Sequence, residues 1–177
     1  MNEEFIPQYW DDILYPSFRA TIRGEYYGVV SQDFVDEELY NLACRAIVAF
    51  KFPKISTDYT TFYAIREDAN TIREVAKEDE DFNQAIPHAY FNNTLTYAEI
   101  EIILAWMKVY WCENQISNAD NFYEIYTDAN IKTYSRANLI DKNIKLMDTF
   151  RKNARELETT YSRVSTTRTP TLGSVND

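Results

Sequence analysis

The middle of the chain decides the fold, where residues 95–112 read LTYAEIEIILAWMKVYWC. Thr96 and Glu99 have the spacing of a capping box, in which the threonine hydroxyl accepts from the Glu99 amide while the Glu99 carboxylate accepts from the Thr96 amide. Leu95 and Ile100 are spaced to form a hydrophobic staple around this cap. Apolar residues then cover more than one face of the predicted helix, so we expect a central helix that packs on several sides.

Two further helices are predicted on either side of this stretch. After Asp33, a candidate N-cap, apolar residues recur at three- and four-residue steps up to Phe50, and Pro53 closes the segment. A similar stripe starts at Ser135 and continues to Tyr161, a length of about 42 Å, which exceeds what a compact domain of this size covers. We therefore expect part of the last helix to protrude or to pack on a neighbouring subunit.

The remaining segments give weaker signals. Residues 8–15 are predicted as a short helix ended by Pro16, residues 21–30 as a small hairpin or a loop, and residues 64–77 as a thinner helix. The four consecutive acids at 78–81 lack the alternating spacing and the glycine of a calcium loop. A solvated loop is therefore favoured for these acids.

The amino-acid composition favours helices. Only three of the 177 residues are glycine, where about 7 % is usual, and none lies between Gly28 and Gly173. This scarcity disfavours an all-β fold and leaves no glycine-rich phosphate loop. The predicted fold class is mainly α, a helical bundle with one long C-terminal helix and an irregular or hairpin N-terminal segment. We expect a single domain over residues 1–161 and an extended C-terminal arm over residues 162–177.

The sequence offers little catalytic or metal-binding chemistry. The single histidine, His88, lies in a loop-like stretch with no serine or cysteine nearby, which disfavours a nucleophilic triad. Cys44 and Cys112 lack metal-ligand spacing and are expected to be buried free thiols in a reducing compartment. Paired carboxylates are possible among 28 acids, but no motif singles out two of them. We therefore expect no enzyme activity, no cofactor and no metal.

The charge balance restricts the partners of the chain. There are 28 acidic and 18 basic side chains, a net charge of −10. This balance disfavours an ordinary DNA-binding protein, because phosphate contacts need clustered Lys and Arg, but it is compatible with surrounding DNA without gripping it. The apolar runs are too short to span a bilayer and the N-terminus has no signal-peptide core, so neither membrane contact nor secretion by a cleaved signal is expected.

Tyrosine is unusually frequent, with 14 copies. Tyrosine side chains are amphipathic and are enriched at protein interfaces. About half of them are expected to fill the rim of a helical core. The aromatic residues that fall outside the strong helical stripes are instead candidates for a subunit interface, and these are Tyr26, Tyr27, Tyr59, Tyr63, Phe122, Tyr123 and Tyr126.

The layout of residues 90–177 resembles a known family. A capped helix over residues 95–107, a second long helix after NIKTYS at 130–135 and a Thr- and Ser-rich C-terminal arm look like the neck, or head–tail connector, proteins of tailed bacteriophages. The composition, rich in Asn, Tyr, Ile, Lys and Asp, further resembles the ring proteins of crAss-like phages that infect gut Bacteroides. The N-terminal third matches no family pattern.

This resemblance implies a homo-oligomeric ring, expected to be a dodecamer, below the portal protein in the virion neck. The chain would be made in the host cytoplasm and contact downstream neck or tail ring proteins, while DNA passes through without specific binding. The arm would dock on the portal through Arg163, Val164, Arg168, Pro170, Leu172 and Val175, or else be a tail without a partner. The acids expected to line the channel, or to solubilise the surface, are Glu67, Asp68, Glu74, Glu78, Asp79, Glu80 and Asp81.

Two alternatives remain open from the sequence. A cytosolic helical adaptor or regulator would bind a partner protein through its aromatic surface and would be a monomer or a dimer. A connector would instead be a ring, or a monomer that assembles only on the portal. A helix-turn-helix DNA-binding protein is a third interpretation, and the negative net charge weakens it.

Overall fold

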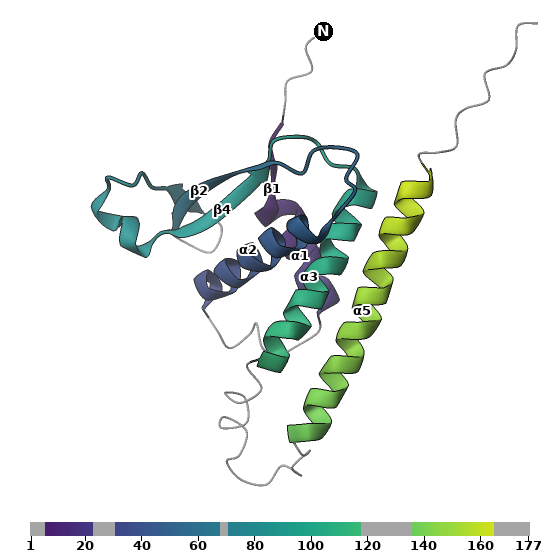
Figure 1. Cartoon of the computed structure of the whole chain (residues 1–177). Helices are drawn as coiled ribbons and strands as arrows, with labels where there is room; N and C mark the ends of the chain where they lie inside the picture. The colour runs from purple at the N-terminus through teal and green to yellow at the C-terminus, as the bar shows by residue number, and fades with distance from the viewer. Residues whose placement is uncertain (1–5, 23–30, 68–70, 118–135, 165–177) are drawn as a thin grey trace, which may run out of the picture.

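The computed structural model describes residues 6–22, 31–67, 71–117 and 136–164. In chain order the elements are β1 (Gln8–Tyr9), α1 (Trp10–Thr21), α2 (Gln32–Ala49), β2 (Tyr59–Arg66), β3 (Ile72–Glu74), the 3-10 helix η2 (Glu80–Gln84), β4 (Ile86–Phe91), α3 (Tyr97–Ser117) and α5 (Arg136–Val164). The strands form one antiparallel sheet in the order β1-β4-β2-β3 (Figure 1). The prediction of a mainly α helical bundle is therefore wrong, because the fold combines helices with a four-stranded sheet.

Strands β2 and β3 occupy the segment that was predicted as a thin helix over residues 64–77. Residues 59–66 read YTTFYAIR, and aromatic and β-branched side chains of this kind favour a strand. The connection to β3 contains Asp68 and Asn70, residue types that turns accept in place of glycine. The scarcity of glycine therefore does not exclude a sheet in this chain.

Strand β4 contains His88, which was predicted to lie in a loop. The preceding residue, Pro87, pairs with Tyr63 of β2 on one side. On its other side β4 pairs with β1 only at Tyr90 and Phe91, so no described strand flanks the edge at Pro87. A proline is tolerated at such an edge because the ladder does not need its missing N–H.

Helix α1 passes through Pro16, so the predicted end of this helix at Pro16 is wrong. Pro16 has no N–H to donate to the carbonyl of Asp12, four residues earlier, so that carbonyl loses its helical hydrogen bond. Asp12 is exposed, so the loss is tolerated. Helix α2 begins after Ser31, whose hydroxyl accepts from the Phe34 amide, rather than after the predicted N-cap Asp33. The hairpin or loop predicted for residues 21–30 lies outside the described residues except at its start.

One hydrophobic core joins the sheet to the helices. Trp10 is fully buried and packs against the rings of Tyr59, Phe91 and Tyr40, with centroid distances of 4.8, 5.5 and 5.6 Å. The predicted capping box of α3 is present, since the Thr96 amide donates to the Glu99 carboxylate at 2.9 Å. Helix α3 then contacts α1, α2 and α5, which confirms the expectation of a central helix packed on several sides.

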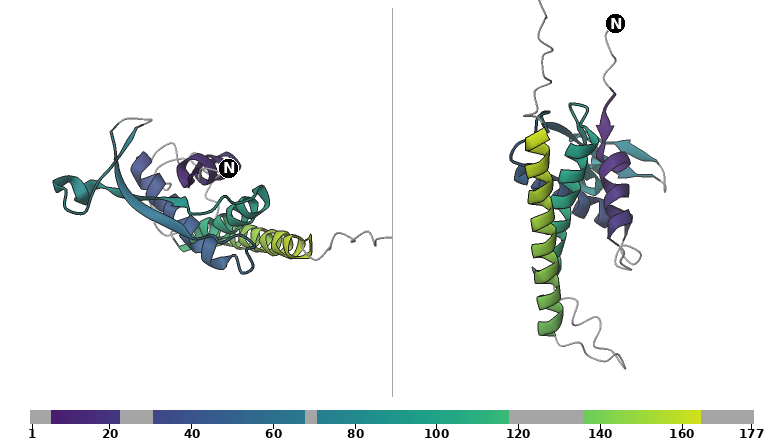
Figure 2. Two further views of the ribbon diagram at one scale, coloured as in Figure 1. Left: turned by 90° about the horizontal axis from the view of Figure 1, so that it is seen from above. Right: turned by 90° about the vertical axis from the view of Figure 1, so that its right-hand side faces the viewer.

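Helix α5 forms one flank of the molecule. It runs antiparallel to α3, and its first turns extend beyond the end of α3 (Figures 1 and 2). The sheet lies on the other side of the body, where the hairpin of β2 and β3 projects away from the helices (Figure 1). The molecule is therefore elongated, with the hairpin and α5 at opposite sides.

Candidate interaction surfaces

A groove with a volume of about 710 Å³ opens between α1, the start of α2 and the strands β2 and β3. Strand register builds one wall, because Phe62 and Arg66 point to the same face of β2. Pairing of Arg66 with Ile72 and of Ala64 with Glu74 places both β3 side chains on that face. The other walls come from Tyr9, Asp11, Asp12, Tyr15, Pro16 and Arg19 around α1, and from Gln32 and Asp36 on α2.

The floor of the groove holds a buried carboxylate, Asp36, whose side chain is 2 % exposed. Arg19 of α1 binds its Oδ1 atom and Arg66 of β2 binds its Oδ2 atom, while Gln32 donates to Oδ1 at 2.7 Å. Asp33 adds a second carboxylate 3.4 Å from Arg66 Nε. Burial of an unpaired charge is costly, so the two guanidinium groups stabilise Asp36 and tie α1, α2 and β2 together.

A histidine–aspartate pair links α1 to β4 beside the groove. His88 is 1 % exposed, stacks on Phe62 and places its Nδ1 atom 3.0 Å from Asp11 Oδ2. Its Nε2 atom is buried and has no hydrogen-bond partner among the described residues. The pair joins α1 to β4 through a partly buried side-chain contact.

Three polar groups of the groove are unpaired within the described residues. The hydroxyl of Tyr15 is buried and has no hydrogen-bond partner there. Burial raises the pKa of Tyr15, and Asp11 and Asp36 raise it further, so the hydroxyl stays neutral. Asp12 and Glu74 are exposed on opposite walls, and neither forms an ion pair in the described ranges. The groove thus offers one hydroxyl and two carboxylates to a ligand.

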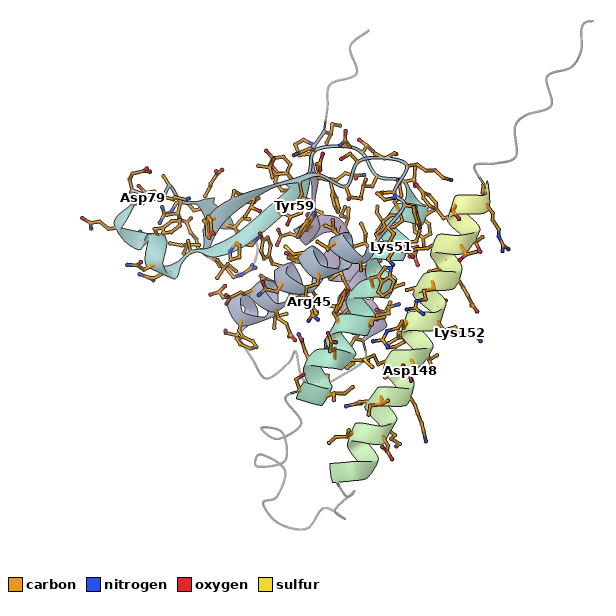
Figure 3. The ribbon with its side chains drawn as sticks, viewed as in Figure 1. Arg45, Lys51, Tyr59, Asp79, Asp148 and Lys152 are labelled. Atoms are coloured by element: carbon orange, nitrogen blue, oxygen red, sulfur yellow. The ribbon has the colours of Figure 1, made fainter. Side chains whose placement is uncertain are left out.

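Among the described channel acids, Glu67 follows β2 and Glu74 ends β3 on the projecting hairpin. Glu78 and Asp79 lie between β3 and η2, where Figure 3 labels Asp79, and Glu80 and Asp81 belong to η2. The described ones are all exposed, as expected for a solvated segment, although Glu80 and Asp81 begin η2. Arg73 lies between Glu67 at 2.9 Å and Asp81 at 3.1 Å, so part of the charge is paired internally. Asp68 lies outside the described residues.

Buried hydrogen bonds hold α5 to the body. Glu99 of α3 accepts from the Tyr161 hydroxyl and from the Ile55 amide at 3.0 Å. Burial raises the pKa of Glu99, but hydrogen bonds from Tyr161, Thr96 and Ile55 lower it by more, so the pKa lies below its usual value. Glu158 also accepts from Trp106 Nε1 at 3.0 Å, so polar contacts as well as packing hold α5 to the body around Glu158 and Tyr161.

The face of α5 that points away from α3 carries a basic stripe, which we define as Asp148, Arg151, Lys152, Arg155, Glu156, Thr159, Thr160 and Arg163. These positions recur at three- and four-residue steps and so share one helix face. Lys152 is 80 % exposed, with its nearest carboxylate, Glu156, 4.0 Å away. Arg155 is exposed and forms no ion pair within the described ranges. Figure 3 shows Lys152 on the side of α5 away from α3.

The predicted aromatic interface is only partly within the described residues. Tyr59 packs on Trp10 in the core and its hydroxyl donates to Cys44 Sγ at 3.4 Å. Tyr63 packs on Phe82 of η2, with 4.9 Å between ring centroids. Both tyrosines are half-buried, and part of each ring already packs within the chain. Tyr26, Tyr27, Phe122, Tyr123 and Tyr126 lie outside the described residues.

The first residues of the predicted portal-docking arm belong to a helix. Helix α5 continues to Val164, so Arg163 and Val164 are helical rather than extended, and the predicted boundary after Tyr161 falls inside α5. The helix does not stop at Tyr161 because Ser162 and Arg163 continue its last turn, with Ser162 Oγ donating to the Thr159 carbonyl at 2.9 Å. Arg168, Pro170, Leu172 and Val175 lie outside the described residues.

Cysteine and metal chemistry add little to these surfaces. Cys112 is buried and Cys44 is half-buried, both as free thiols, and burial raises the pKa of Cys112 to about 11. Within the described ranges, no three His, Cys, Asp or Glu side chains gather in a way that could hold a metal ion. The same ranges contain no helix long and apolar enough to cross a membrane.

No local sequence pattern predicts the groove, although a signal for its floor exists. Asp36 lies three residues before Leu39 and seven before Ala43, which places it on the buried face of α2. A charged residue at such a position predicts a buried ion pair. The partners Arg19 and Arg66 come from distant segments, and no local pattern connects them to Asp36.

We compared the chain with protein-family models, with curated proteins and with solved structures, and none of them matches it.

Proposed function

We propose that this chain is a structural virion protein, a head–tail connector that forms a ring below the portal and surrounds part of the DNA channel. The observation that carries the proposal is the two-sided charge of the molecule. One side presents the groove, where Asp12 and Glu74 form no ion pair within the described ranges, and the other presents the basic stripe of α5. A surface and its complement on opposite sides favour head-to-tail association of identical copies, which gives a closed ring or a filament.

The net charge suits a channel. A ring that passes a genome must not bind phosphates, and a negative wall avoids binding by repulsion. The net charge of the chain is −10, and helix α5 holds seven of its 18 basic side chains. The remainder of the chain therefore carries most of the negative charge. The projecting hairpin, together with the segment after it that carries Glu78, Asp79, Glu80 and Asp81, is our candidate for the channel wall.

The C-terminal end of α5 is our candidate for the portal side of the ring. Val164 is 68 % exposed at the last turn, and Phe52 and Tyr97 are also exposed. Lys54 donates to Tyr161 through both its backbone amide and its Nζ atom, so the segment that follows Phe52 lies against the last turns of α5. Exposed apolar side chains near the start of the predicted arm support docking of a partner at this end.

The decisive experiment is mass photometry of the purified chain, alone and mixed with the portal protein encoded by a neighbouring reading frame. A ring, or a monomer that assembles on the portal, is the expected result. A matched control uses the chain ended after residue 164, which keeps α5 complete and removes the predicted arm beyond it. A stable dimer without portal affinity, or no portal among the neighbouring reading frames, would contradict the proposal and favour the adaptor alternative.

A further inference from the structure

We propose that the groove between α1, α2 and the β2–β3 hairpin binds the basic stripe of α5 from a second copy of this chain. The inference rests on the proposed ring, because it assigns the contact that would join neighbouring copies. Lys152 and Arg155 of one copy enter the groove of the next and pair with Asp12 and Glu74.

The groove has the chemistry that a long basic side chain needs. Phe62 and Ile72 give an apolar wall for the methylene stem of a lysine or arginine. Asp12 and Glu74 stand on opposite walls as exposed carboxylates without partners in the described ranges. The oxygen of the buried, unpaired Tyr15 hydroxyl can accept from an entering ammonium or guanidinium group.

The existing charges of the groove favour a cation over an anion. Arg19 and Arg66 are held by Asp36, and Arg66 lies also beside Asp33, so their positive charge is already balanced. Asp12 and Glu74 then give the groove a negative surplus. An anionic ligand would meet this surplus, whereas a basic one would neutralise it.

The stripe of α5 offers two cations with suitable spacing. Lys152 and Arg155 are three residues apart, and side chains at this separation are neighbours on one face of a helix. Arg151 is partly engaged by Asp148 at 3.3 Å, so Lys152 and Arg155 are the side chains best placed to leave the helix surface. A helix that lays one face into a groove is a common mode of protein recognition.

The two surfaces cannot meet within one copy. Helix α5 packs on α3, whereas the groove lies beyond α1 and α2 beside the hairpin (Figures 1 and 2). The contact must therefore join different copies. Because the groove and the stripe lie on different sides of the body (Figures 1 and 2), one neighbour does not cover both, so the contact is heterologous. Each copy then uses its groove on one neighbour and its stripe on the other.

Charge reversal tests this contact. The groove variant Asp12→Lys/Glu74→Lys and the stripe variant Lys152→Glu/Arg155→Glu are each expected to associate with themselves at least tenfold more weakly than the wild type, measured by sedimentation velocity over a concentration series. An equimolar mixture of the two variants is expected to recover association, because the reversed groove then faces a reversed stripe. Glu37→Lys and Lys142→Glu are matched controls, since both residues are exposed outside the two surfaces.

A milder variant keeps the test independent of folding. Tyr15→Phe removes a hydroxyl that has no partner within the described chain, so we expect an unchanged melting temperature and about threefold weaker association. Equal association of the wild type and both charge-reversal variants would overturn the proposal, as would a wild type that stays monomeric alone and on the portal. Rings on the portal that survive both reversals would overturn this contact while leaving the connector function standing.

Discussion

Two buried carboxylates, Asp36 and Glu99, connect segments that are far apart in the chain. Asp36 bridges Arg19 and Arg66, and Glu99 joins the start of α3 to Ile55 and to Tyr161 of α5. Each replaces water by several hydrogen bonds from charged or backbone donors, which is the condition for keeping a carboxylate buried. Their loss should therefore destabilise the fold more than the loss of any exposed acid.

We expect Asp36→Asn to lower the free energy of unfolding by about 2–3 kcal/mol, because two guanidinium groups lose their common counter-charge while remaining partly hydrated. The measurement is urea unfolding followed by circular dichroism. Asp33→Asn is the matched control, since the Asp33 side chain is 56 % exposed and its pairing with Arg66 should contribute less than about 1 kcal/mol. Equal effects of the two variants would contradict the role assigned to Asp36.

Glu99 should make stability depend on pH. Its pKa is lowered in the folded chain, so the unfolded chain takes up the proton first as the pH falls below about 4.5, and the free energy of unfolding decreases there. Glu99→Gln should cost about 1–3 kcal/mol at pH 7 and less at pH 3, which flattens the pH profile. Denaturant unfolding at pH 7, 5, 4 and 3 measures this, with the exposed Glu156→Gln as control. A parallel profile for Glu99→Gln would refute the assignment.

Local sequence predicts helix α5 well, but it does not predict the β2–β3 hairpin. Helix α5 has a periodic stripe over its length, and the structure places a helix there with nearly the expected bounds. The apolar positions of residues 64–77 also suggested a helix, yet Tyr59–Arg66 forms a strand whose partners are β3 and β4. Pairing with β4 depends on residues about 25 positions later, which periodicity does not detect.

Ala154 sets how closely α5 approaches the body. It is fully buried in the core, whereas its neighbour Asn153 is exposed. We expect Ala154→Leu to lower the free energy of unfolding by about 1–3 kcal/mol through overpacking, and Asn153→Leu to change it by less than about 0.5 kcal/mol. Thermal unfolding of both variants checks the difference. A neutral Ala154→Leu would mean that α5 is loosely seated.

At the scale of the whole molecule, charge is distributed by side rather than evenly. The hairpin and η2 project with exposed acids on one side, while the basic stripe lies on the other (Figure 3). Repulsion between the hairpin and DNA would keep a duplex free to slide if the hairpin faces a channel. A test should therefore reverse the charge of several of these acids together and not only of one residue.

Glu78→Lys/Glu80→Lys should impair genome packaging and ejection by retaining DNA in the channel, since both acids are exposed and lack ion-pair partners in the described ranges. The measurement is phage titre and DNA release in an infection assay with the variant gene. Glu37→Lys adds one matching positive residue outside the hairpin and should leave both unchanged. Packaging and ejection at wild-type levels in the double variant would remove the hairpin from the channel wall.

Features that depend on neighbouring residues could be predicted from the amino-acid sequence alone. The capping box at Thr96 and Glu99, the central helix and the long last helix all follow from spacings within a few turns, so local physics was sufficient to predict them. The sheet, the pairing of Asp36 with Arg19 and Arg66, and the groove with the Tyr15 hydroxyl that lacks a partner in the described residues became visible only in the folded chain. These features need segments that are distant in sequence, and their energies come from strand pairing and ion pairing across the fold.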